Sequence, residues 1–256
     1  MGLYKICQIQ KITLKINLQN KMEKITFQTE DGVKIVADWY QPETQSQGKN
    51  ERPKTDQPGI KKAILMLHMM PSDKTSWKSL AEKLTKVGFY CLATDLRGHG
   101  ESTNSTKGPL NYNKFVDQEH QLSRLDVLGA IKFLKDIGFT KEKIVLIGAS
   151  VGANLAIDYA AHNPDIKAIV ALSPGLDYKG IEIEAAISKL TQKQFLLLAA
   201  SQEDSYSFSS VKILSEKTKA QKQTKLFKNV GHGTDMLIKE KDLENEIVDW
   251  LIKIFK

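Results

Sequence analysis

Cysteine, arginine and long apolar runs are scarce in this 256-residue sequence. Its two cysteines, Cys7 and Cys91, do not suggest a disulfide framework, so we expect a reducing compartment, the cytoplasm. No histidine and cysteine cluster has metal-ligand spacing and no phosphate-binding loop is present, so we predict no metal and no cofactor. No run of about 18 apolar residues occurs, and we therefore expect no membrane partner.

Positive charge exceeds negative charge, with 37 basic against 30 acidic residues and a net charge of +7. Arginine occurs only at positions 52, 97 and 124, and a lysine-rich excess is typical of a solvated surface, so no nucleic-acid partner is expected. Residues 1–21 carry four lysines and no acid, and they lack an apolar signal-peptide core. We interpret them as a disordered leader or as a start codon assigned too early, with one domain at residues 22–256.

The rest of the chain alternates apolar strand-like runs with helix-like segments. This alternation predicts an α/β fold with a mostly parallel sheet of about eight strands and helices on both faces. An antiparallel hairpin around the turn Glu30-Asp31-Gly32 is expected to precede the parallel part. Strands are predicted at residues 23–29, 33–40, 62–67, 90–93, 144–147, 168–172, 195–200 and 224–230, and helices at 74–87, 115–137, 151–162, 208–220 and 238–255.

The most informative segment is Gly148-Ala149-Ser150-Val151-Gly152, which follows the apolar run at residues 144–147 and precedes a helix-like stretch. A serine in a sharp strand-to-helix turn needs very small residues two positions before and after it, because larger side chains would collide. Such a turn exposes the Ser150 hydroxyl and directs the Val151 N–H to a developing oxyanion. The pattern predicts the nucleophile elbow of a serine hydrolase.

The general base should follow the serine in the chain, after the acid. Of the five histidines, only His162 and His232 lie beyond Ser150. His162 ends the helix that Ser150 begins, about 18 Å from the elbow at 1.5 Å per residue. His232 stands between two glycines just after a predicted strand, where a tight loop can bring its imidazole to the serine. We therefore predict that His232 is the base.

The acid has three candidates. Asp204 lies in the loop after the predicted strand 195–200, immediately before the strand that leads to His232, and we favour it for holding the imidazole tautomer. Glu203 is adjacent but is expected to point elsewhere. Asp177, in the loop after the strand 168–172, competes for the same role.

The second oxyanion donor is expected in the loop His68-Met69-Met70-Pro71, after the strand 62–67. We predict that the Met70 N–H donates and that His68 braces the loop by hydrogen bonds. The methionine side chains are expected to line the substrate site, with Met69 as a substrate-binding residue.

Together these residues resemble the α/β-hydrolase superfamily, from about residue 22 onward. The segment from Asp95 to Ser102, Asp-Leu-Arg-Gly-His-Gly-Glu-Ser, is similar to a structural motif of that family. The resemblance implies that Asp95 and Arg97 fix a loop and that His99 is not catalytic. Where the family usually has His-Gly, this chain has His68-Met69, which leaves the oxyanion donor between Met69 and Met70.

Lid domains of this superfamily usually follow the sixth strand. Here only residues 173–193 separate two predicted strands, enough for a loop and one short helix at 183–190. A large cap is therefore not expected, which favours small acyl substrates. The segment Ser173 to Tyr178 is predicted to line one wall, with Asp177 as a substrate-binding residue.

These features predict an ester hydrolase that works through an acyl-enzyme intermediate and acts on a small-molecule carboxylic or thio-ester. Serine aminopeptidase or C–C bond hydrolase activity would use the same residues. A protein of a different class, with the same fold used for binding without turnover, is also compatible with the sequence. We expect a monomer or a homodimer.

Overall fold

The computed structural model describes residues 22–42 and 61–255. The interpretation of residues 1–21 as a leader falls outside this part of the chain, as does Cys7.

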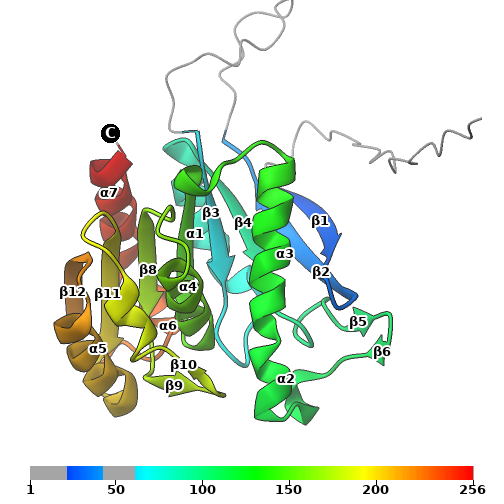
Figure 1. The fold of residues 1–256 in the computed structure, drawn as a ribbon. Helices are drawn as coiled ribbons and strands as arrows, with labels where there is room; N and C mark the ends of the chain where they lie inside the picture. Colours follow the sequence, from blue (N-terminus) through cyan, green and yellow to red (C-terminus); the bar gives the residue numbers. More distant parts are fainter. Residues whose placement is uncertain (1–21, 43–60, 256) are drawn as a thin grey trace, which may run out of the picture.

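The described residues form an α/β-hydrolase fold, which confirms the predicted fold class (Figure 1). Its mixed sheet has ten strands in the order β12-β11-β8-β7-β3-β4-β2-β5-β6, with β1 paired to β2. The six strands from β12 to β4 run parallel, whereas β2 is antiparallel to both β4 and β1. Its strands are β1 (Met22–Gln28), β2 (Val33–Tyr40), β3 (Lys62–Leu67), β4 (Phe89–Thr94), β5 (Asn104–Ser105), β6 (Gly108–Pro109), β7 (Ile144–Ala149), β8 (Ala168–Leu172), β11 (Phe195–Ser201) and β12 (Gln221–Phe227).

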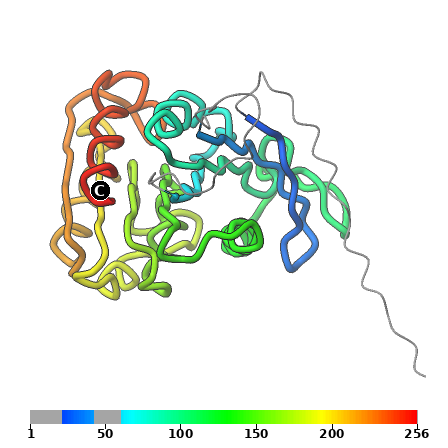
Figure 2. The backbone as a smooth tube through the Cα atoms, turned by 90° about the horizontal axis from the view of Figure 1, so that it is seen from above, coloured from blue at the N-terminus to red at the C-terminus, as the bar shows by residue number. Residues whose placement is uncertain are grey.

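Helices cover both faces of this sheet, as Figure 2 shows in a view along the strands. Helices α3 (Ser123–Asp136), α4 (Val151–Ala161) and α5 (Ser205–Lys217) lie on one face, and α1 (Lys78–Lys86), α6 (Asp235–Lys239) and α7 (Leu243–Phe255) on the other. Side chains alternate between the faces, so Leu65 packs toward the first group and Met66 toward the second. Complete burial of one such side chain contributes about 1.5–3 kcal/mol to the free energy of folding.

Two predicted helices are each interrupted. The segment 115–137 forms α2 (Asp117–Gln121) and α3, with Leu122 between them, and the segment 238–255 is occupied by the end of α6 and by α7. In α2 only His120 is buried, so no apolar stripe leads into α3. Between α6 and α7 the chain reads Glu240-Lys241-Asp242, so no apolar side chain is available there to continue a buried helix face. Periodicity locates the buried stripes but does not detect such breaks.

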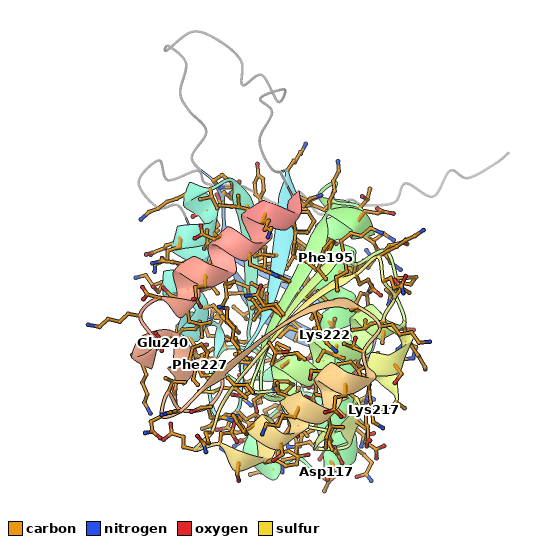
Figure 3. The ribbon with its side chains drawn as sticks, turned by 90° about the vertical axis from the view of Figure 1, so that its left-hand side faces the viewer. Asp117, Phe195, Lys217, Lys222, Phe227 and Glu240 are labelled. Carbon is orange, nitrogen blue, oxygen red and sulfur yellow. The ribbon has the colours of Figure 1, made fainter. Side chains whose placement is uncertain are left out.

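Several other boundaries differ by a few residues. The predicted helix 74–87 begins as a 3-10 helix, Lys74–Trp77, before α1. Helix α5 begins three residues before the predicted start because Asp204 caps it, accepting the Ser207 N–H at 3.4 Å. Strand β12 ends at Phe227, before the predicted Val230. Figure 3 shows β12, with Lys222 and Phe227 labelled, at the edge of the sheet beside α5, whose end is marked by Lys217.

Three further 3-10 helices are Tyr112–Lys114, Lys141–Lys143 and Ala186–Lys189. Between β8 and β11 the chain forms a two-stranded hairpin, β9 (Asp177–Tyr178) and β10 (Ile181–Glu182), followed by the 3-10 helix Ala186–Lys189. The hairpin lies at the carboxyl ends of the parallel strands (Figure 1). None of the helices in residues 22–42 and 61–255 combines the length and the apolar composition that a membrane-spanning segment needs.

Candidate active site

Ser150 lies at the junction between β7 and α4, at the carboxyl ends of the parallel strands. Its backbone has φ 53° and ψ −122°, in a region that non-glycine residues rarely adopt. A Cβ atom at Gly148 would overlap the Gly152 carbonyl, and one at Gly152 would overlap the Leu67 carbonyl. The two glycines thus let α4 approach β7 and β3 closely enough to make this turn.

His232 and Asp204 meet at the same carboxyl ends of the strands. His232 Nδ1 lies 2.6 Å from Asp204 Oδ2, in a charge-assisted hydrogen bond or ion pair. Asp204 follows β11 and His232 follows β12, and these two strands are hydrogen-bonded neighbours. The contact with the carboxylate leaves the Nε2 side of the imidazole to face a reacting group.

The two competing acids have different partners. Glu203 accepts a hydrogen bond from the Gly231 N–H and so holds the backbone of the histidine loop. Asp177 is exposed on the β9–β10 hairpin, where its Oδ1 accepts the Gly180 N–H at 2.7 Å and closes the turn. Of the three candidates, Asp204 is the one in contact with the imidazole.

Ser173 braces the histidine loop from the neighbouring strand β8, and sequence reasoning gave it no individual role. Its φ of 49° turns the chain sharply just after β8. Its Oγ accepts the Gly233 N–H at 2.9 Å and donates to Met236 Sδ at 3.4 Å. The fully buried Ser173 hydroxyl therefore connects Gly233 and Met236, which both follow His232, to the end of β8.

His68 and the two methionines follow β3 on the other side of Ser150. Leu96 donates its N–H to His68 Nε2 at 2.9 Å, so His68 Nδ1 carries the proton and donates to the Met69 carbonyl at 2.7 Å. Complete burial lowers the pKa of His68, which keeps it neutral in this bracing position. Met69 reaches the histidine loop, because a Cβ atom at Gly233 would lie 2.5 Å from its Sδ. Met70 packs against the core on the α4 face.

The loop after β4 is held by buried ion pairs. Lys74 Nζ lies 2.7 Å from Asp95 Oδ2, and both side chains are almost fully buried. Arg97 is paired in the same way with Asp126, at 2.8 Å. Burial raises the pKa of Asp126 to about 6, against the opposing charge of Arg97. These contacts support the structural interpretation of Asp95 and Arg97.

The histidines at positions 99 and 162 have different surroundings. Burial and the neighbouring His68 lower the pKa of His99 to about 3, and its ring stacks on Tyr112 with 3.8 Å between centroids. His162 is exposed at the end of α4, where its Nδ1 lies 2.9 Å from the Asp158 carbonyl. Neither imidazole contacts Asp204.

Tyr178 belongs to the segment that was predicted to line one wall of the site, but sequence reasoning gave it no individual role. Its ring lies edge-to-face against the His232 imidazole, with 6.2 Å between centroids, and its hydroxyl is 2.7 Å from Ser207 Oγ. Burial raises the pKa of Tyr178 to about 12, although hydrogen bonds with Ser207 and Ser150 oppose the rise. The hairpin that carries Tyr178 turns through Lys179 and Gly180, both at positive φ. The sequence analysis did not predict this hairpin or the contact between Tyr178 and His232.

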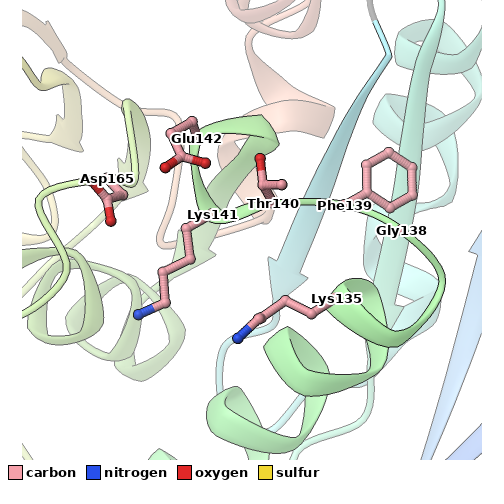
Figure 4. A pocket seen from close by; sticks show the side chains of 7 residues that line it. All are labelled: Lys135, Gly138, Phe139, Thr140, Lys141, Glu142 and Asp165. Carbon is pink, nitrogen blue, oxygen red and sulfur yellow. The ribbon is translucent and has the colours of Figure 1, made fainter.

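A hollow elsewhere on the molecule has no link to these residues. It lies between the end of α3 and the start of β7 (Figure 4), whereas Ser150 follows the end of β7. In the described part of the chain, no three histidine, cysteine or acidic side chains form a group that could hold a metal ion. The hollow is lined by Lys135, Gly138, Phe139, Thr140, Lys141, Glu142 and Asp165.

Residues 58–232 match the model of the Hydrolase_4 family, described as serine aminopeptidase, S33. The match extends over well more than half of the chain and includes Ser150, Asp204 and His232. The chain therefore belongs to the Hydrolase_4 family of the α/β-hydrolase superfamily.

Curated relatives match a part of the chain. Monoacylglycerol lipase abhd6-A of Xenopus laevis is 32% identical over 123 residues, which are 47% of this chain and 33% of that protein. Epoxide hydrolase 3 of Siraitia grosvenorii is 35% identical over 116 residues, covering 45% of this chain and 33% of that protein. The chain thus spans about a third of the length of these relatives.

Solved structures match almost the whole chain at low identity. The esterase PF2001 of Pyrococcus furiosus has a TM-score of 0.68 and 17% identity and covers 100% of both chains. A dienelactone hydrolase of Anabaena variabilis has a TM-score of 0.67 and 16% identity, covering 93% of this chain and 100% of its own. These likenesses concern the fold.

Proposed function

We propose that the protein is a serine esterase that hydrolyses carboxylic or thio-esters of small acyl groups. The observation that carries the proposal is the His232–Asp204 contact of 2.6 Å at the sheet edge where the strained turn presents Ser150. An imidazole held in one tautomer by a carboxylate is the base that a serine nucleophile requires.

In the proposed reaction, Ser150 Oγ attacks the ester carbonyl carbon while His232 Nε2 removes the hydroxyl proton. The backbone N–H groups of Val151 and Met70 bind the resulting oxyanion. The bond to the leaving oxygen then breaks, and His232 gives its proton to that oxygen. Water attacks the acyl-enzyme by the same steps, which releases the acid and restores the Ser150 hydroxyl. The reaction needs no cofactor.

The family description makes serine aminopeptidase activity the second candidate, and it would use the same three residues. The short segment between β8 and β11 favours the esterase, because a peptidase of this family would normally carry a larger cap. A C–C bond hydrolase and a non-catalytic binding protein could be built on the same fold. Incubation with p-nitrophenyl esters beside aminoacyl p-nitroanilides separates esterase from peptidase.

We expect a fluorophosphonate probe to label the purified protein at Ser150, because the elbow and His232 make this hydroxyl nucleophilic. Digestion and mass spectrometry identify the modified residue. Prior heat denaturation should abolish labelling, since the reactivity depends on the folded site. A probe that maps to another serine, or that labels native and denatured protein alike, would contradict the proposed nucleophile.

Substrate length provides a separate prediction. The hairpin and one 3-10 helix are the elements between β8 and β11, so we expect no large apolar cover for a long chain. Esters with acyl chains of roughly two to six carbons should have the highest kcat/KM, because longer chains gain little further burial. A series of p-nitrophenyl esters measures this preference, and a maximum at about twelve carbons or more would contradict it.

A further inference from the structure

The backbone of the loop that carries His232 has little stiffness of its own. Gly231 and Gly233 flank the histidine at φ values of 82° and 58°, and glycine restricts the backbone less than any other residue. The His232 side chain is 33% exposed, so packing alone does not fix it. The orientation of the imidazole therefore depends on hydrogen bonds from neighbouring elements.

Before His232, two side chains bind the backbone of this loop. Ser201 Oγ accepts the Val230 N–H at 3.0 Å, and Glu203 accepts the N–H of the next residue. Ser201 ends β11, and Glu203 follows it in the same turn that carries Asp204. The first half of the loop thus keeps one of these two hydrogen bonds if the other is lost.

After His232, the loop has a single side-chain partner. Ser173 Oγ accepts the Gly233 N–H at 2.9 Å, and within the described part of the chain no other side chain hydrogen-bonds to the backbone of residues 233–236. Gly233 is buried. Without the Ser173 hydroxyl its N–H would be unsatisfied, which favours a rearranged loop.

The Ser173 hydroxyl is itself held at a fixed place. Ser173 is fully buried, and its N–H donates to the Ala199 carbonyl of β11 at 2.7 Å. Its Oγ donates to Met236 Sδ at 3.4 Å, so its lone pairs are free to accept from Gly233. Its φ of 49° is strained for serine, and such strain occurs mostly where function requires it.

We propose that Ser173 is a positioning residue whose hydroxyl, by holding the Gly233 N–H, keeps His232 Nε2 within reach of Ser150. This inference rests on the proposed esterase function and adds a residue to it. Nε2 must take the Ser150 proton and later give a proton to the leaving oxygen, and both transfers require hydrogen-bond distance. A displacement of about 1 Å at such a group can cost about 10² in rate. Because Ser173 is fully buried, it acts through His232 and not on the substrate.

Two substitutions remove this hydroxyl with different effects on the backbone. Ser173→Ala keeps a side chain at positive φ, whereas Ser173→Gly relieves the strain. We expect each variant to lower kcat for p-nitrophenyl butanoate by about 10- to 100-fold, with KM changed by about twofold or less. The two losses should be similar, because the hydroxyl and not the strain carries the effect.

Ser102→Ala is the matched control. Ser102 is fully buried, and its Oγ accepts the Val36 N–H and donates to the Asp95 carbonyl, both at 2.9 Å. The variant loses the same kind of buried hydrogen bond between β2 and the loop after β4. Its thermal midpoint should therefore fall about as far as that of Ser173→Ala, while its kcat should stay within about threefold of the wild type.

A spectroscopic measurement separates positioning from stability. The Nδ1 proton of His232 lies in a short charge-assisted hydrogen bond with Asp204 and should give a strongly downfield resonance in proton NMR, identified by its absence in His232→Ala. Both Ser173 variants should shift or broaden this resonance, because the imidazole is no longer held in one orientation. Ser102→Ala should leave it at the wild-type position.

Equal losses of kcat in Ser173→Ala and Ser102→Ala would show that Ser173 has a structural role only. Wild-type kcat in Ser173→Gly would show that turnover does not need the hydroxyl, and an unshifted downfield resonance in variants that have lost activity would show that His232 is not displaced. Either result would overturn the inference while esterase activity stands. If the wild type hydrolyses no p-nitrophenyl ester, the proposed function itself fails and the inference with it.

Discussion

Replacing Ser150 by alanine is expected to lower kcat for ester hydrolysis by about 10⁶, which removes nearly all measurable turnover. The variant lacks the oxygen that forms the acyl-enzyme, while the oxyanion donors and the substrate contacts remain. A methyl group fits the same turn, so the thermal midpoint should change by about 2 °C or less. Progress curves with p-nitrophenyl butanoate, together with a melting curve, measure both quantities.

Ser209→Ala is the matched control, because Ser209 is exposed on α5, away from Ser150. It should retain wild-type turnover. Turnover that survives Ser150→Ala, after purification from a host without background esterase activity, would show that the nucleophile is another residue.

The second large effect is expected from Asp204→Asn, which should lower kcat by a factor of about 10⁴. The amide cannot stabilise the imidazolium, and it favours the wrong imidazole tautomer. Asparagine is as good a helix N-cap as aspartate, so α5 keeps its cap and the fold is preserved. The loss of activity then reports on the His232–Asp204 contact rather than on stability.

Asp177→Asn and Glu203→Gln are the controls for the acid. Their carboxylates bind the backbone N–H groups of Gly180 and Gly231, which an amide oxygen can also accept. We expect each to change kcat by about threefold or less. A large loss in Asp177→Asn with a mild one in Asp204→Asn would move the acid to the hairpin after β8.

The sequence was sufficient to predict the fold because its strongest signals are local. Ile144 to Ile147 is apolar without interruption, which is typical of a strand buried on both faces, and the glycines around Ser150 define the turn that follows. The strand order then brings the loops after β7, β11 and β12 to one edge. Motif and chain order together thus predicted that Ser150, His232 and Asp204 meet at this end of the strands, and the structure shows the contact between His232 and Asp204.

The sequence predicted that Ser173 to Tyr178 line one wall of the site, but not the individual contacts of these two residues, which depend on distant segments. Tyr178 lies beside His232 because Tyr206, on another element, holds the hairpin by its backbone. Ser173 acts through a positive φ that serine rarely adopts and through a bond to Gly233, sixty positions away. Neither residue type carries a pattern of its own, so the contacts that each of them makes follow from tertiary geometry.

The position of β12 at the end of the sheet affects how copies of this chain can associate. An edge strand presents unpaired backbone groups, and sheets extend where such an edge is flat and apolar. In β12 the first four residues, including Lys222, are exposed and polar, and Lys225 is paired with Glu246 at 2.7 Å. A second strand would have to bury these cations against its own backbone. Sheet extension at β12 is therefore disfavoured.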